Sequence, residues 1–72
     1  MEKIIVSGYE VLLKFDEDDQ IWVASALAFP GCMTHGTTQS TAADEMKIAI
    51  KLQLAVFTEL KKEAPKAIAI YA

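Results

Sequence analysis

The chain has 72 residues, of which 53% are hydrophobic, and its 10 acidic residues against 7 basic ones give a net charge of −3. This length fits one domain spanning residues 1–72, near the lower limit for independent folding. All the basic residues are lysines and they form no cluster, which argues against direct binding of nucleic acid. An acidic surface instead favours a basic partner, and the high apolar content predicts a homo-oligomer, a dimer or a tetramer.

The cysteine content and the N-terminus indicate the compartment. A single cysteine excludes an internal disulfide and favours a reducing environment, so we expect a cytoplasmic location. The first apolar run, residues 4–6, is too short for a signal peptide or a membrane span. The sequence therefore predicts no membrane partner.

The first part of the chain has strand character. Residues 3–15 are rich in β-branched and aromatic side chains, and a bulge or bend is predicted at Ser7 and Gly8. The acidic run 16–19 predicts a turn. A second strand is expected over residues 20–27, with both faces apolar enough for a central strand.

A turn and a short strand should follow. Pro30-Gly31 is a turn signal, because proline presets φ at the first central turn position and glycine supplies a positive φ at the second. We expect a brief third strand near residues 32–35. The octet 29–36 is therefore the corner where the strands end and a helix begins.

The next segment has the pattern of one long helix. It should begin between Thr38 and Thr41, with Thr38 or Ser40 as the N-cap. It should end near Glu63, because Pro65 cannot continue a helix and disfavours helical backbone in the residue before it.

Apolar residues at helical spacing predict the face of the helix that packs on the sheet. These residues are Ala42, Ala43, Met46, Ala49, Ile50, Leu54, Val56, Phe57 and Leu60. Ile48, Leu52 and Ala55 lie outside this stripe. We interpret these three residues, together with Trp22, as a candidate oligomer interface; the alternative is scattered surface aliphatics.

A final short strand is expected over residues 67–71, returned by the helix through a right-handed crossover. The predicted fold class is α+β. Its architecture is a two-layer β-β-β-α-β domain with one mixed sheet and one helix on one face. The other sheet face would be unprotected, which again favours association.

Several short motifs follow one another at distinctive spacings along residues 9–71. After the acidic turn come an aromatic-Val-Ala segment, a Pro-Gly-Cys turn, a polar pair ending in glycine, a threonine, and a helix with spaced alanines. The segments are Trp22-Val23-Ala24, Pro30-Gly31-Cys32, His35-Gly36, Ala42 and Ala49. This arrangement resembles the HicB antitoxin family of bacterial and archaeal toxin–antitoxin systems.

The resemblance implies a degenerate ribonuclease H-like fold without catalysis. Its members neutralise HicA, a small basic ribonuclease, by covering its active site. Many relatives carry a C-terminal DNA-binding segment, whereas this chain stops at Ala72. We therefore expect a truncated chain or a single-domain member. The alternatives are an orphan self-assembling domain with no toxin partner and a metal-dependent nuclease.

The polar residues give a few chemical hypotheses. Asp16, Glu17, Asp18 and Asp19 are tempting as a Mg²⁺ site, but consecutive acids in one turn splay apart, so we interpret them as a solvated turn that steers a basic partner. We expect no metal and no cofactor.

His35 is the only histidine in the sequence. A catalytic pair with Cys32 is not expected, because residues three apart on a strand face opposite sides. His35 remains a candidate partner contact, and Cys32 is predicted to be a small buried hydrophobe.

Overall fold

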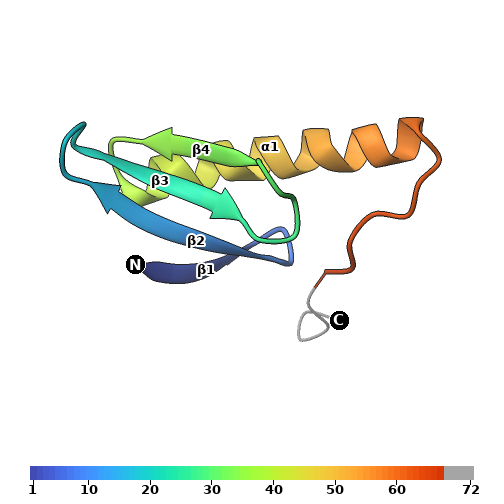
Figure 1. Ribbon diagram of the computed structural model, residues 1–72, viewed down its shortest axis with the longest axis horizontal. Helices are drawn as coiled ribbons and strands as arrows, with labels where there is room; N and C mark the ends of the chain where they lie inside the picture. The colour runs from blue at the N-terminus through green and yellow to red at the C-terminus, as the bar shows by residue number, and fades with distance from the viewer. Residues whose placement is uncertain (68–72) are drawn as a thin grey trace.

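The computed structural model describes residues 1–67 and contains one sheet and one helix (Figure 1). The elements, in chain order, are β1 (Glu2–Val6), β2 (Tyr9–Asp16), β3 (Ile21–Ala26), β4 (Met33–Gly36) and α1 (Gln39–Glu59). The four strands are antiparallel and lie in the order β1-β2-β3-β4. The predicted α+β class is confirmed at this level.

Ser7 and Gly8 form a hairpin turn, and the predicted bend in a single strand is wrong. Val6 pairs with Tyr9, and the two residues between them have φ angles of 52° and 85°. Positive φ at both central positions is the mark of a type I′ turn, whose twist matches that of antiparallel strands. Four strands rather than three therefore precede the helix.

The other two turns agree with their sequence signals. The carboxylate of Asp16 accepts hydrogen bonds from the amides of Asp18 and Asp19 at 3.0 and 3.3 Å, which closes the acidic turn. At the Pro-Gly corner, the amide of Cys32 donates to the carbonyl of Phe29 at 2.9 Å, and Gly31 has a φ of 83°. This is the type II geometry that the sequence predicts.

The helix begins where it was expected. Thr38 is the N-cap, and its side-chain oxygen accepts a hydrogen bond from the amide of Thr41 at 3.0 Å. The side chain of Thr34 on β4 donates to the carbonyl of Ala42 at 3.1 Å. A Cβ built on Gly36 would lie 2.6 Å from the Ala42 nitrogen, so the first turn of α1 contacts the β4 backbone directly.

The helix ends at Glu59, four residues before the predicted end. The amides of Lys61 and Lys62 donate to the carbonyls of Thr58 and Phe57, and Lys61 has a φ of 55°. These two bonds define a Schellman motif, in which a left-handed residue turns the chain away from the helix axis. The helix therefore stops well before Pro65.

One face of the sheet and the N-terminal part of α1 enclose the core. The buried apolar residues are Val6, Tyr9, Val11, Leu13, Ala24, Ala26, Phe29, Cys32, Ala42, Met46 and Ile50. The prediction of the packing stripe is right for the first half of the helix and wrong for Val56 and Leu60, which are 51% and 59% exposed. The reason is that α1 extends beyond the sheet, so its C-terminal half has no strand beneath it (Figure 1).

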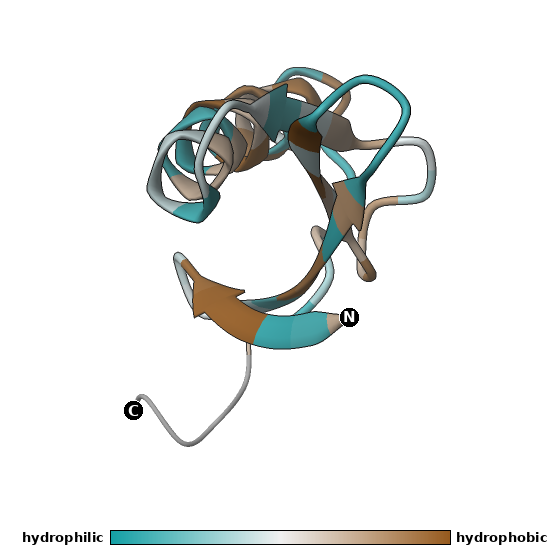
Figure 2. Cartoon of the chain, turned by 90° about the vertical axis from the view of Figure 1, so that its left-hand side faces the viewer, coloured by the Kyte–Doolittle hydropathy of each residue, from teal (hydrophilic) through white to brown (hydrophobic). Residues whose placement is uncertain are grey.

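The sheet is strongly curled, so that β1 comes round toward the start of the helix (Figure 2). The side-chain amide of Gln39 donates to the carboxylate of Glu2 at 2.7 Å across this approach. Three aromatic side chains pack in a row between the first hairpin and the helix. The ring centres of Tyr9 and Phe29 are 4.9 Å apart, and those of Phe29 and Phe57 are 6.1 Å apart.

The segment after the helix leads back to the first hairpin. The hydroxyl of Tyr9 donates to the carbonyl of Pro65 at 2.6 Å. The expected strand over residues 67–71 is not seen at Ala67, and its remaining residues lie outside the described part of the chain. The described sheet is antiparallel, so the mixed sheet stays a prediction.

The contact between the tail and the first hairpin can be tested at Gly8. A Cβ on Gly8 would lie 2.9 Å from the Cβ of Ala67, whereas a Cβ on Gly31 would meet no atom within 4 Å. Both glycines have nearly the same positive φ, so alanine costs each about 1–2 kcal/mol of backbone strain. We expect Gly8→Ala to lower the free energy of unfolding in urea by about 1 kcal/mol more than Gly31→Ala. Equal losses would show that the tail is not held against the hairpin.

Candidate functional site

The sheet face opposite α1 is not covered by any element of the described chain. Its side chains are those of Lys3, Ile5, Glu10, Leu12, Lys14, Asp16, Ile21, Val23, Ser25, Met33 and His35, and none of them is buried. We call this set the open face. It mixes aliphatic and charged residues, and its Lys3–Glu10 ion pair of 2.8 Å is exposed and contributes little to stability.

A depression of about 470 Å³ lies where the open face meets the β2–β3 turn. It is lined by Lys14, Phe15, Asp16, Glu17, Asp18, Val23, Ser25 and Met33. Three carboxylates and one lysine ammonium thus lie beside one aromatic and two aliphatic side chains, so the lining keeps a net negative charge. This chemistry suits a long cationic side chain, whose apolar stem and charged head have different preferred surroundings.

The acidic turn has the geometry of a solvated turn. Glu17, Asp18 and Asp19 are exposed. The carboxylate of Asp16 already accepts hydrogen bonds from two backbone amides of the turn. Within residues 1–67, no three side chains of histidine, cysteine, aspartate or glutamate are grouped so that they could hold a metal ion. Of the four predicted partner-contact acids, Asp16, Glu17 and Asp18 line the depression and Asp19 does not.

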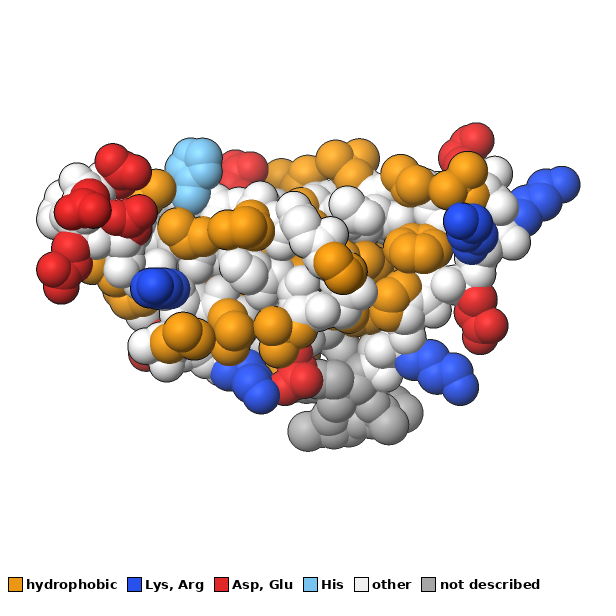
Figure 3. Space-filling model, in the orientation of Figure 1, with side chains coloured by type: hydrophobic (Ala, Val, Ile, Leu, Met, Phe, Trp, Pro, Cys, Tyr) orange, Lys and Arg blue, Asp and Glu red, His pale blue; other side chains and the backbone are white. Residues whose placement is uncertain are grey.

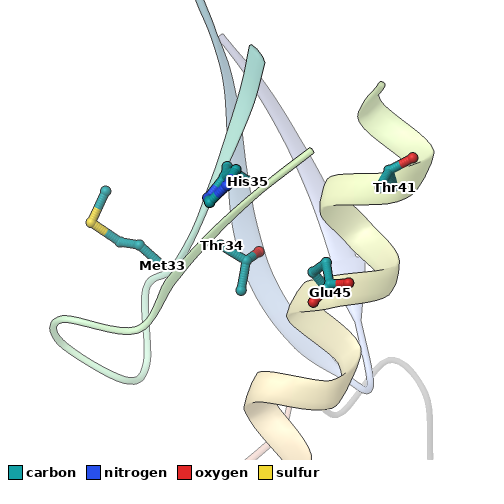
Figure 4. A pocket seen from close by; sticks show the side chains of 5 residues that line it. All are labelled: Met33, Thr34, His35, Thr41 and Glu45. Atoms are coloured by element: carbon teal, nitrogen blue, oxygen red, sulfur yellow. The ribbon is translucent and has the colours of Figure 1, made fainter. Parts of the chain in front are cut away.

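A second hollow, of about 350 Å³, lies between the edge strand β4 and the start of α1. Met33, Thr34 and His35 form one wall, and Thr41 and Glu45 form the other. In Figure 4, Thr34 points toward the helix, whereas Met33 leaves the strand on the opposite side. We call this hollow the edge groove.

Cys32, directly before β4, and His35 on β4 point to opposite faces of the sheet, as predicted. The thiol of Cys32 is buried 3.9 Å from the sulfur of Met46, whereas His35 is exposed at the edge groove. A thiolate–imidazole pair is therefore excluded by geometry.

One side of α1, from its middle to its C-cap, carries exposed aliphatic side chains at a spacing of four residues. Ile48, Leu52, Val56 and Leu60 are 56%, 63%, 51% and 59% exposed, and we call them the α1 strip. Ala55 beside them is exposed as well. Figure 3 shows hydrophobic side chains gathered along the surface that α1 forms.

Trp22 does not belong to the α1 strip. It is half-buried on the helix-facing side of the sheet, and its ring centre lies 5.3 Å from that of Phe15. The four residues predicted as an oligomer interface are thus not brought together: Ile48, Leu52 and Ala55 share one surface and Trp22 lies apart.

Sequence reasoning missed the second wall of the edge groove and half of the α1 strip. Thr41 and Glu45 come next to β4 only through the turn that reverses the chain between strand and helix, and no local pattern reports this. Val56 and Leu60 were assigned to the sheet-facing stripe from their angular position around the helix axis, without regard to how far the sheet extends. The signal that could have found them is length, since a helix of 21 residues far outreaches a strand of four.

The geometry defines a small α+β protein with an uncovered sheet face, an acidic turn and an exposed aliphatic helix strip. Among residues 1–67, no helix combines the length and the apolar character needed to cross a membrane. Comparison with protein-family models, with curated proteins and with solved structures finds no significant match to this chain.

The buried thiol gives a pH-dependent prediction. Burial favours the neutral form and so raises the pKa of the Cys32 thiol. Below the pKa of an unfolded thiol, about 8.5, both states keep the proton. Above it the unfolded chain ionises first, so the free energy of unfolding falls as pH rises, until the folded thiol also ionises.

We therefore expect the free energy of unfolding in urea to fall more between pH ~7.5 and pH ~9.5 for the native chain than for Cys32→Ala. The slope of the free energy of unfolding against pH is compared between the two chains. This comparison removes the contributions of lysine and tyrosine, which both chains share. Parallel slopes would contradict a buried neutral thiol.

Proposed function

We propose that this protein is a non-enzymatic, antitoxin-like binding module of the cytoplasm that neutralises a small basic ribonuclease of the HicA type by covering its active site. One observation carries this proposal: the open face is uncovered, and the carboxylates of Asp16, Glu17 and Asp18 lie at its end beside an aliphatic depression. The resemblance of the motifs in residues 9–71 to the HicB family supplies the class of partner.

The mechanism follows from the chemistry of that surface. Exposed carboxylates on a chain of net charge −3 attract a basic protein over several ångströms and orient its approach. The aliphatic residues Val23 and Met33 then offer the apolar contact that gives a complex its lifetime. Coverage of the toxin's active site needs no reactive group on this chain.

The finer fold is part of the same proposal. The elements β2, β3, β4 and α1 supply the β-β-β-α portion of a degenerate ribonuclease H-like domain, and β1 is an additional edge strand beside β2. The expected final strand falls on residues 67–71, of which only Ala67 lies in the described part of the chain, and Ala67 is not in a strand.

Neutralising the acidic turn tests the proposed function. The triple variant Asp16→Asn, Glu17→Gln, Asp18→Asn keeps the side-chain oxygen that caps the turn and removes three charges. With a small basic ribonuclease of the HicA type as the partner, we expect the dissociation constant to rise about tenfold or more, mainly through slower association at low salt. The measurement is association kinetics together with inhibition of RNA cleavage.

The matched control is Asp44→Asn, Glu59→Gln, Glu63→Gln, which removes the same charge from exposed positions away from the open face. We expect this control to change the dissociation constant by less than about threefold. Equal effects of the two triple variants would contradict a specific site, and failure of the native chain to inhibit the ribonuclease would end the antitoxin proposal.

Self-association is a second proposed property, and the α1 strip favours it. Four aliphatic side chains, each more than half exposed, form one surface on a helix that overhangs its sheet. An assembly built through this strip would exist whether or not a toxin is bound, which is the behaviour of an orphan self-assembling domain.

A single charge in the strip should disperse such an assembly. We expect Leu52→Glu to raise the dimer dissociation constant about tenfold or more in sedimentation equilibrium, because the new carboxylate cannot be buried unpaired. Thr58→Glu adds the same charge at an exposed helix position outside the strip and should have little effect. A native chain that stays monomeric at all concentrations would contradict self-association.

A further inference from the structure

The hydrogen-bond pattern of the sheet shows which backbone groups of β4 have no partner among residues 1–67. The amide of Ala26 donates to the carbonyl of Cys32 at 3.0 Å, so this opposed pair is hydrogen-bonded. Along two antiparallel strands, hydrogen-bonded residue pairs alternate with pairs that are not hydrogen-bonded. The next hydrogen-bonded pairs are therefore those of Thr34 and Gly36 with β3, and the residues between them, Met33 and His35, direct their N–H and C=O groups outward.

The other side of β3 supports the same assignment. The amide of Leu27 donates to the carbonyl of Glu10 at 3.1 Å. By the same alternation, the backbone groups of Ser25 and Val23 are hydrogen-bonded to β2. These two residues lie opposite Met33 and His35. Their groups are used on the β2 side, so they are not available to β4.

The two edges of the described sheet differ in their protection. The β1 edge carries Lys3, and a charged side chain on an edge strand discourages the addition of another strand. In contrast, β4 has the sequence Met-Thr-His-Gly, without lysine or proline, and Met33 is 62% exposed. The edge of β4 is therefore the one that accepts a further strand.

The edge groove adds a chemical preference to this edge. Glu45 faces β4 across a hollow of about 350 Å³, with Thr41 beside it (Figure 4). A strand that pairs with Met33 and His35 would lie along this groove. The residue of that strand opposite Thr34 would direct its side chain to the helix-facing side, toward the Glu45 carboxylate.

The same carboxylate argues against a second copy of this chain as the occupant. A two-fold β4–β4 pair would be centred on Thr34 and would bring both copies of Glu45 beside the symmetry axis. Two like charges in one groove repel, whereas a lysine or arginine from a different chain would be attracted.

We infer that the β4 edge binds an extended segment of a basic partner protein by antiparallel strand addition, with an arginine or lysine directed at Glu45 and apolar residues on either side of it. Backbone bonds to Met33 and His35 give the segment its direction and register. The partner class rests on the proposed function, but the edge and its preference rest on the geometry of β4 and α1.

A synthetic peptide tests this edge without any toxin. The probe is the blocked heptapeptide Ser-Thr-Val-Arg-Val-Thr-Ser, titrated into the full ¹⁵N-labelled chain. We expect saturable binding, with the largest amide shifts and new protection from hydrogen exchange at Met33 and His35. Shifts centred on β1 and β2, or no saturation, would overturn the inference.

Matched peptides and variants isolate the two interactions. N-methylation of both valines removes the donors to β4 and should weaken binding about tenfold or more, whereas N-methylation of the arginine, whose N–H points away, should not. Glu45→Gln should weaken binding of the native peptide by about threefold or more, and Asp44→Asn should leave it unchanged. Equal effects within either pair would overturn the inference.

Measuring both ribonuclease inhibition and peptide binding with the full chain distinguishes this inference from the proposed function. If the ribonuclease is inhibited and Glu45→Gln has no effect on its binding or on that of the peptide, the edge inference fails and the antitoxin function stands. If the peptide binds as described and no ribonuclease is inhibited, the proposed function fails and the edge inference stands.

Discussion

The close approach of α1 to β4 at Gly36 is the contact on which the rest of the structure depends. Because Gly36 has no Cβ, the backbone of the first helical turn lies against the strand, and the side chain of Thr34 reaches the carbonyl of Ala42. This contact places the helix at one side of the sheet. It determines which sheet face is covered, and it forms the groove beside the β4 edge.

The two candidate binding surfaces have different physical characters. The open face and the acidic turn offer long-range attraction and an aliphatic depression, and neither demands an exact register. The β4 edge offers directional backbone groups, which demand both direction and register. A partner that used both surfaces would be attracted by the first and aligned by the second, and Met33 lines the hollow at each of them.

Local chemistry explains what could be predicted from the sequence. The Pro-Gly turn, the Thr38 cap and the burial of Cys32 depend on a few neighbouring residues, and all three are confirmed. Ser7-Gly8 was misread because a bulge and a tight hairpin use the same residues, and the distinction depends on pairing between β1 and β2. The edge groove joins residues of two elements across a chain reversal, which helical or strand periodicity does not report.

The tail contact has a consequence for biosynthesis. The bond from Tyr9 to Pro65 joins residues 56 positions apart, whereas the contact that seats the helix joins residues only 8 apart. Contacts between distant residues form late, since the intervening chain must first be ordered. On the ribosome, the hairpins and the helix have their partners early, but Tyr9 must wait until Pro65 has left the exit tunnel. The tail contact therefore forms after the hairpins and the helix that it joins.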